Sequence, residues 1–129
     1  MPRRRSSIAT LMGLEAATLA MMSILHLTGI LTGRSKPFDP TNAGVAEAVI
    51  GIVLTAGAVT LRRPAAPQRA VPLAAVVLAI VGFAVGLNFA IRGGDAIDIA
   101  YHATVLPLLV LTLAALLWDR GAAGTPACI

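Results

Sequence analysis

Four long apolar segments occupy most of this 129-residue chain, at 8–31, 43–61, 71–91 and 96–118. Each has about 19 to 24 residues, which is enough for an α-helix to cross a hydrocarbon core about 30 Å thick. Only 12% of the residues are charged, whereas about a quarter are charged in a typical soluble domain. The sequence therefore predicts an all-α integral membrane protein whose first partner is the lipid bilayer.

Short polar connections separate the four segments, at 33–40, 62–69 and 92–95. Connections of this length favour antiparallel packing of consecutive helices. We therefore expect a single domain over residues 1–129, built as an antiparallel four-helix bundle. Asp39-Pro40 is typical of a helix start, with Asp as the cap and Pro in the first turn.

The distribution of basic residues predicts how the bundle lies in the membrane. An N-terminus in the cytoplasm leaves three basic residues on the outer side and seven on the inner side, in keeping with the positive-inside rule. Both termini are then cytoplasmic, and we expect the membrane to be a bacterial inner membrane. The outer set is Arg34, Lys36 and Arg92, and the inner set is Arg3, Arg4, Arg5, Arg62, Arg63, Arg69 and Arg120. This pattern explains the basic residues without nucleic-acid binding, which needs a basic patch with interleaved aromatics.

Each apolar segment carries one polar side chain at a similar predicted depth: His26, Glu47, Asn88 and His102. From the helical rise, all four lie about 5 to 8 Å below the outer boundary of the membrane. Ionisable groups inside a bilayer are costly and usually functional. We therefore predict that the four side chains point inward and form a common polar layer that binds a ligand.

Two acidic residues extend this layer. Asp98 lies one helical turn before His102, on the same helix face, where it is expected to orient the imidazole. Capping of the fourth helix by Asp95 and Asp98 is the alternative role. Glu15 lies three turns from His26 on the same face, about 16 Å nearer the cytoplasm. It is expected either to accept a hydrogen bond from a Ser or Thr of a neighbouring helix or to serve as a proton or cation site.

The third segment contains a Gly-x-x-x-Gly motif, Gly82 and Gly86, a pattern that favours close packing of membrane helices. From helical geometry this ridge points away from Asn88, so we predict that it packs a neighbouring helix or a second copy of the chain. The single cysteine, Cys128, excludes an intramolecular disulfide and a Cys-x-x-Cys site.

In size and number of spans the chain resembles the small multidrug resistance transporters. Glu15 occupies a place similar to their functional glutamate in the first helix. That resemblance implies a transport function, but the aromatic residues along their substrate path have no counterpart in segments so poor in Trp and Tyr.

These features leave three functions open. The leading hypothesis is a non-enzymatic membrane protein with a polar site near its outer face that binds or moves a proton, a cation or a small solute. The second is a metal-dependent membrane enzyme or redox subunit with His26, Glu47 and His102 as metal ligands. The third is an accessory subunit of a membrane complex in which the polar layer fixes helix packing. No sequence motif identifies a cofactor or the substrate.

Overall fold

The computed structural model describes residues 2–63 and 69–123, with side chains for 4–63 and 69–119. Within these ranges the chain forms four helices, α1 (Pro2–Leu27), α2 (Pro40–Arg62), α3 (Ala70–Gly93) and α4 (Ala96–Ala123). All four are long and apolar enough to cross a membrane. The predicted all-helical, four-helix architecture is confirmed, and Cys128 lies outside the described residues.

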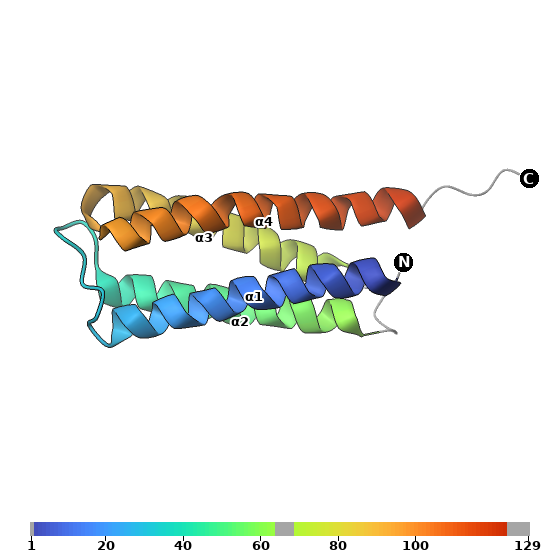
Figure 1. Cartoon of the computed structure of the whole chain (residues 1–129), viewed down its shortest axis with the longest axis horizontal. Coiled ribbons are helices and arrows are strands. Elements are labelled where there is room, and N and C mark those ends of the chain that lie inside the picture. Colours follow the sequence, from blue (N-terminus) through green and yellow to red (C-terminus); the bar gives the residue numbers. More distant parts are fainter. Residues whose placement is uncertain (1, 64–68, 124–129) are drawn as a thin grey trace, which may run out of the picture.

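Consecutive helices run in opposite directions, so α1 begins and α4 ends at the same end of the bundle (Figure 1). We call this the termini end. The opposite end, where residues 28–39 join α1 to α2 and residues 94–95 join α3 to α4, is the loop end. The α1–α2 pair packs more extensively than the α1–α4 pair.

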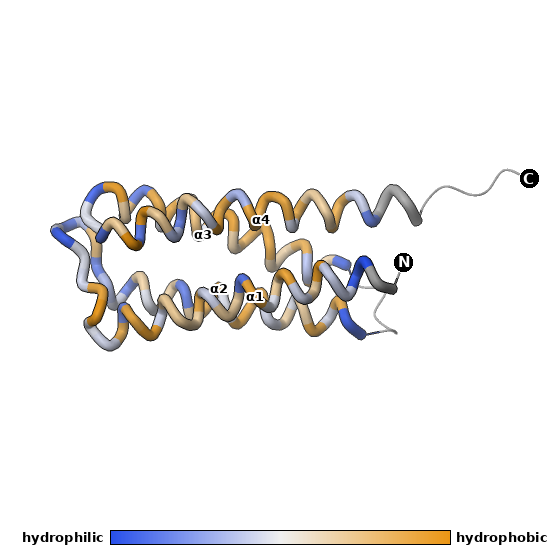
Figure 2. The backbone as a smooth tube through the Cα atoms, in the orientation of Figure 1, coloured by the Kyte–Doolittle hydropathy of each residue, from blue (hydrophilic) through white to orange (hydrophobic). Residues whose placement is uncertain are grey.

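Many large apolar side chains are exposed on the outside of the bundle. Figure 2 shows that hydrophobic residues run along all four helices. Ile30, Ile52 and Leu111 are each more than 60% exposed, whereas Leu54, Phe83 and Leu109 are buried between the helices. An apolar exterior of this extent is suited to lipid rather than to water. This supports a small multi-pass membrane protein.

The first helix ends four residues earlier than its apolar run suggests, at Leu27 rather than at Leu31. Gly29 adopts a left-handed backbone, with φ of +75°, and its N–H donates to the carbonyl of His26. The N–H of Ile30 donates to the carbonyl of Leu25. This is a Schellman termination, for which glycine is preferred because it has no Cβ. The apolar pattern continues past it and hides the helix end.

The remainder of this connection lies over the loop end and is fastened to the α3–α4 turn. The backbone N–H groups of Arg34 and Ser35 donate to the carbonyl of Gly93, at 2.7 and 3.1 Å. The N–H of Gly33 donates to Oδ2 of Asp95 at 3.0 Å. The residues that cover the loop end thus connect the two halves of the bundle.

The start of α2 agrees with the sequence prediction. The side chain of Asp39 accepts a hydrogen bond from the N–H of Asn42 at 3.1 Å, and Pro40 occupies the first turn. This cap places Glu47 two turns into the helix. Phe38, which directly precedes Asp39, is buried, with its ring 5.7 Å from the ring of His26.

Candidate functional site

Most of the acidic residues of this protein are buried, which reverses the usual arrangement. All six acidic residues lie in the described ranges, and four of them are 5% exposed or less: Glu15, Glu47, Asp98 and Asp119. Both histidines are buried as well. Polar groups at these positions lie between helices, not on the lipid-facing surface. The candidate functional side chains therefore lie in the interior of the bundle.

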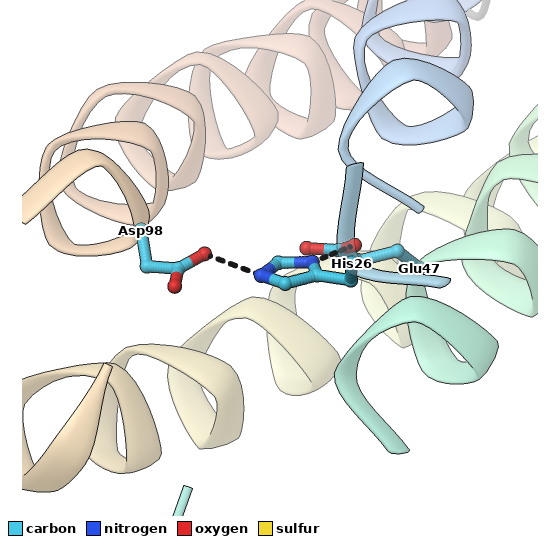
Figure 3. A group of neighbouring side chains, drawn as sticks. All are labelled: His26, Glu47 and Asp98. Carbon is cyan, nitrogen blue, oxygen red and sulfur yellow. Dashed lines mark hydrogen bonds and ion pairs between the residues drawn. The ribbon is translucent and has the colours of Figure 1, made fainter. Parts of the chain in front are cut away.

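His26 lies between two carboxylates from two other helices, as Figure 3 shows. Its Nδ1 is 2.9 Å from Oε2 of Glu47, in hydrogen-bonding geometry. Its Nε2 is 2.9 Å from Oδ1 of Asp98, close enough for an ion pair but not aligned as a hydrogen bond. An imidazole with a carboxylate at each nitrogen is best matched by the doubly protonated, cationic ring. We call these three residues the triad.

Close packing of α1 against α2 brings His26 to Glu47. Gly44 lies one turn before Glu47, and a side chain there would collide with Leu27 and press on Cβ of His26. The absence of a Cβ also allows the hydroxyl of Ser23 to donate to the Gly44 carbonyl at 2.7 Å. The small residue therefore sets the distance between the helices at the height of the triad.

Asp98 reaches the triad from the first turn of α4. Its Oδ2 accepts the backbone N–H of Asp95 at 3.3 Å, as in a capping box, while its Oδ1 faces His26. The predicted capping role of Asp98 is therefore confirmed, and its other carboxylate oxygen faces His26. The side chain of Asp95 does not cap α4 but binds the N–H of Gly33.

His102 lies outside the triad, and the prediction that the carboxylate of Asp98 orients it is wrong. Its Nδ1 donates instead to the backbone carbonyl of Asp98 at 2.8 Å, because the carbonyl at position i points toward position i+4 on a helix. The Asp98 carboxylate is turned to His26. The opposite nitrogen of His102, Nε2, faces Gly86 so closely that a Cβ there would overlap it.

A cavity of about 290 Å³ adjoins the triad between α2 and α3. Glu47 and His102 are its buried ionisable residues, and most of the other lining groups are apolar. All three phenylalanines of the chain, Phe38, Phe83 and Phe89, line it. Glu47 thus contacts both His26 and the cavity that His102 borders. The sequence analysis missed this aromatic enclosure because Phe38 lies far along the chain from Phe83 and Phe89.

Asn88 does not belong to this site. The prediction that it points inward is wrong, since its side chain is exposed on the surface of α3. Gly82 and Gly86, which lie on other faces of the helix, point inward instead, toward Ile50 of α2 and His102 of α4. These glycines pack helices of the same chain, and association of two copies through them stays a prediction.

Glu15 is buried at a separate place, farther toward the termini end. Its Oε1 accepts a hydrogen bond from the hydroxyl of Thr112 at 2.8 Å, which confirms the predicted partner type on a neighbouring helix. Thr18, one turn along α1, has its hydroxyl 3.2 Å from that of Tyr101 on α4. The contact between Thr18 and Tyr101 was not predicted, because the two residues are far apart in the sequence.

Two buried carboxylate oxygens have no polar partner among the described residues, Glu15 Oε2 and Glu47 Oε1, and the ion pair of His26 Nε2 with Asp98 Oδ1 is not aligned as a hydrogen bond. Native proteins satisfy the large majority of buried polar atoms, so a cluster of exceptions calls for an explanation. One nitrogen or oxygen of each triad residue lies within 4.8 Å of the others, a spacing compatible with a bound cation. The triad can therefore take up a proton, a water molecule or a cation.

Comparison of the chain with protein-family models, with curated proteins and with solved structures finds no match. The functional argument consequently rests on the geometry of the site.

Proposed function

We propose that the protein exchanges protons at a site formed by the triad near the outer face of the cell membrane, beside which a small solute also binds. The observation that carries this proposal is the buried imidazole between two carboxylates, one of which, Glu47, keeps an oxygen without a partner among the described residues. A group of this kind can gain or lose a proton without a large movement of the helices.

A purely structural role explains the triad less well. Replacing a buried ion pair by well-packed apolar residues is often neutral or stabilising, so stability alone does not require three ionisable groups. A structural network would also be expected to satisfy its own polar atoms. Within the triad, His26 Nε2 and Asp98 Oδ1 face each other at 2.9 Å, whereas Oε1 of Glu47 has no polar partner among the described residues.

Polar contacts continue from the triad along the α1–α4 interface toward the termini end. In order they are His26–Asp98, Thr18–Tyr101, Glu15–Thr112 and Arg5–Asp119, at distances between 2.8 and 3.4 Å. The helical rise separates His26 from Thr18 by about 12 Å and Thr18 from Glu15 by about 4.5 Å. We propose this row, which we call the α1–α4 seam, as the route of the proton, with Glu15 as its inner station.

The orientation of this route follows from the basic residues. We propose that the loop end faces outward and that the N-terminus and C-terminus are cytoplasmic, because this arrangement places more arginines on the inner side. Arg5 and Arg69 lie at the termini end, where both contact Asp119. The triad is then close to the external solution.

The test is proton exchange by purified protein in liposomes that contain a pH-sensitive dye, after an external pH step with charge compensation by potassium and valinomycin. We expect His26→Ala to slow exchange about tenfold or more, because the transfer group is removed. Asn88→Ala, which changes a polar residue on the exposed side of α3, should leave the rate unchanged.

Equal rates for wild type, His26→Ala and empty liposomes would contradict the proposal. A metal present in stoichiometric amount in the purified protein, and lost in His26→Ala, would favour the metal hypothesis instead. The metal hypothesis is supported by the short distances, up to 4.8 Å, between one nitrogen or oxygen atom of each triad residue. A metal would have to replace the proton at one nitrogen of His26, since both nitrogens now face carboxylates.

A further inference from the structure

The polar residues that line the cavity beside the triad include two acidic residues, Asp39 and Glu47, and the imidazole of His102. Oε1 of Glu47 is buried and has no partner among the described residues. His102 donates from Nδ1 to a backbone carbonyl, so in its neutral form Nε2 carries the lone pair and can only accept. Both residues line the cavity. A complementary ligand must therefore supply donors.

Charge narrows the ligand further. The triad holds two carboxylates around one imidazole, which leaves one negative charge when the ring is protonated. A buried uncompensated charge is costly in a membrane, and a cation bound next to Glu47 would neutralise it. The described residues that line the cavity include no Arg or Lys that would repel such a cation.

The residues that line the cavity indicate the size and the apolar character of the ligand. Phe38, Phe83 and Phe89 surround the space, and aromatic faces attract cations as well as apolar groups. An apolar cavity of about 150 Å³ is known to hold benzene, so 290 Å³ accommodates one ring with a short side chain. Ala46 and Phe89 are exposed at the rim, which opens the cavity to the surface between α2 and α3.

We propose that this cavity binds a small organic ammonium ion with an apolar body of about one ring, whose charge is paired with the carboxylate of Glu47 and whose N–H donates to His102 Nε2. This inference rests on the proposed function, because it names the solute that shares Glu47 with the triad. Entry is from the outer leaflet or the outer interface, through the opening between α2 and α3.

The experiment is isothermal titration calorimetry with three matched probes and the full chain in detergent micelles, with protein-free micelles as the blank. 2-Phenylethylammonium carries the charge and the N–H donors, 2-phenylethanol carries one donor without charge, and phenyltrimethylammonium carries charge without a donor. We expect the first to bind about tenfold or more tightly than either of the others, since hydrogen bonds between charged groups are the stronger ones.

Variants separate the cavity from the fold. Glu47→Gln keeps the size of the side chain and should weaken 2-phenylethylammonium binding about tenfold or more. Ala46→Leu fills the rim without touching a charge and should abolish binding. Asn88→Ala should bind as the wild type does. Gel filtration and circular dichroism of each variant establish that the helices are intact.

Tight binding of 2-phenylethanol or phenyltrimethylammonium, equal to that of the amine, would overturn the proposed ligand class. Unchanged amine binding by Ala46→Leu would overturn the location. The proposed function fails on a different result: the rate of proton exchange in liposomes would be the same for the wild type, for His26→Ala and for empty liposomes. Ala46→Leu should retain that exchange even though it no longer binds the amine.

Discussion

His26 is the residue on which the candidate site depends, because it is in contact with α2 and α4 at once through its two nitrogens. Removing the imidazole leaves Glu47 and Asp98 buried without the cation between them. Unpaired buried charges cost several kcal/mol in the interior of a protein. Substitution of His26 should therefore lower both the stability of the protein and its rate of proton exchange. Substitution of a residue farther along the α1–α4 seam can change one of these properties without the other.

Glu15 offers that separation. Glu15→Gln keeps an oxygen that accepts the hydrogen bond from Thr112, so the midpoint of thermal unfolding should change little. The amide cannot exchange a proton, so proton exchange in liposomes should fall about tenfold or more. A variant that retains the wild-type rate would exclude Glu15 from the route.

Thr112→Val is the matched variant of the same contact. It removes the hydroxyl donor and leaves both oxygens of Glu15 without a partner among the described residues. We expect a loss of stability of about 1 to 3 kcal/mol, measured by denaturant titration in detergent, because an unsatisfied buried acceptor keeps its desolvation penalty. Equal stability of Thr112→Val and the wild type would contradict this account.

At the scale of the helices, glycines decide how closely the ionisable groups approach one another. Gly44 sets the α1–α2 distance next to His26, and Gly86 leaves room for the ring of His102. In both cases the glycine lies opposite a histidine on another helix. Substitution of either glycine should therefore displace the neighbouring histidine.

Gly86→Ala and Gly82→Ala form a matched pair on α3. A Cβ at 86 would overlap Nε2 of a rigid ring that Asp98 holds by its carbonyl, whereas a Cβ at 82 would meet only the flexible end of Ile50. We expect Gly86→Ala to destabilise the protein by about 1 to 3 kcal/mol and to weaken 2-phenylethylammonium binding.

Gly82→Ala should be tolerated to within about 1 kcal/mol, because Ile50 can change rotamer and alanine favours the helix. Denaturant titration of both variants in the same detergent provides the comparison. A larger loss for Gly82→Ala than for Gly86→Ala would show that the ring of His102 is free to move away.

At the scale of the whole molecule, the orientation in the membrane decides which solution the triad faces. The chain has one cysteine, Cys128, so its thiol reports the side of the C-terminus without any engineering. We expect a membrane-impermeant maleimide to label Cys128 in permeabilised cells but not in intact cells, since the positive-inside rule places the C-terminus in the cytoplasm. Labelling in intact cells would reverse the orientation of the site.

The number and type of the elements follow from the sequence, because the length and the composition of an apolar run are local properties. The capping of α2 by Asp39 and the hydroxyl partner of Glu15 follow for the same reason, from short-range helix chemistry and from the cost of a lone buried carboxylate. The end of α1 was harder to predict from the sequence, because the apolar run continues past the helix end at Leu27 to Leu31.

What the sequence by itself determined is therefore a four-helix membrane protein with ionisable groups at a shared depth. Only the tertiary structure decided which groups meet, because depth fixes the position of a residue along a helix but not the rotation of that helix. Rotation of α3 turns Asn88 outward and Gly86 inward. The rotation of α4 directs the carboxylate of Asp98, not the ring of His102, to His26. Packing against neighbouring helices sets those rotations, and it joins residues more than twenty positions apart into one site.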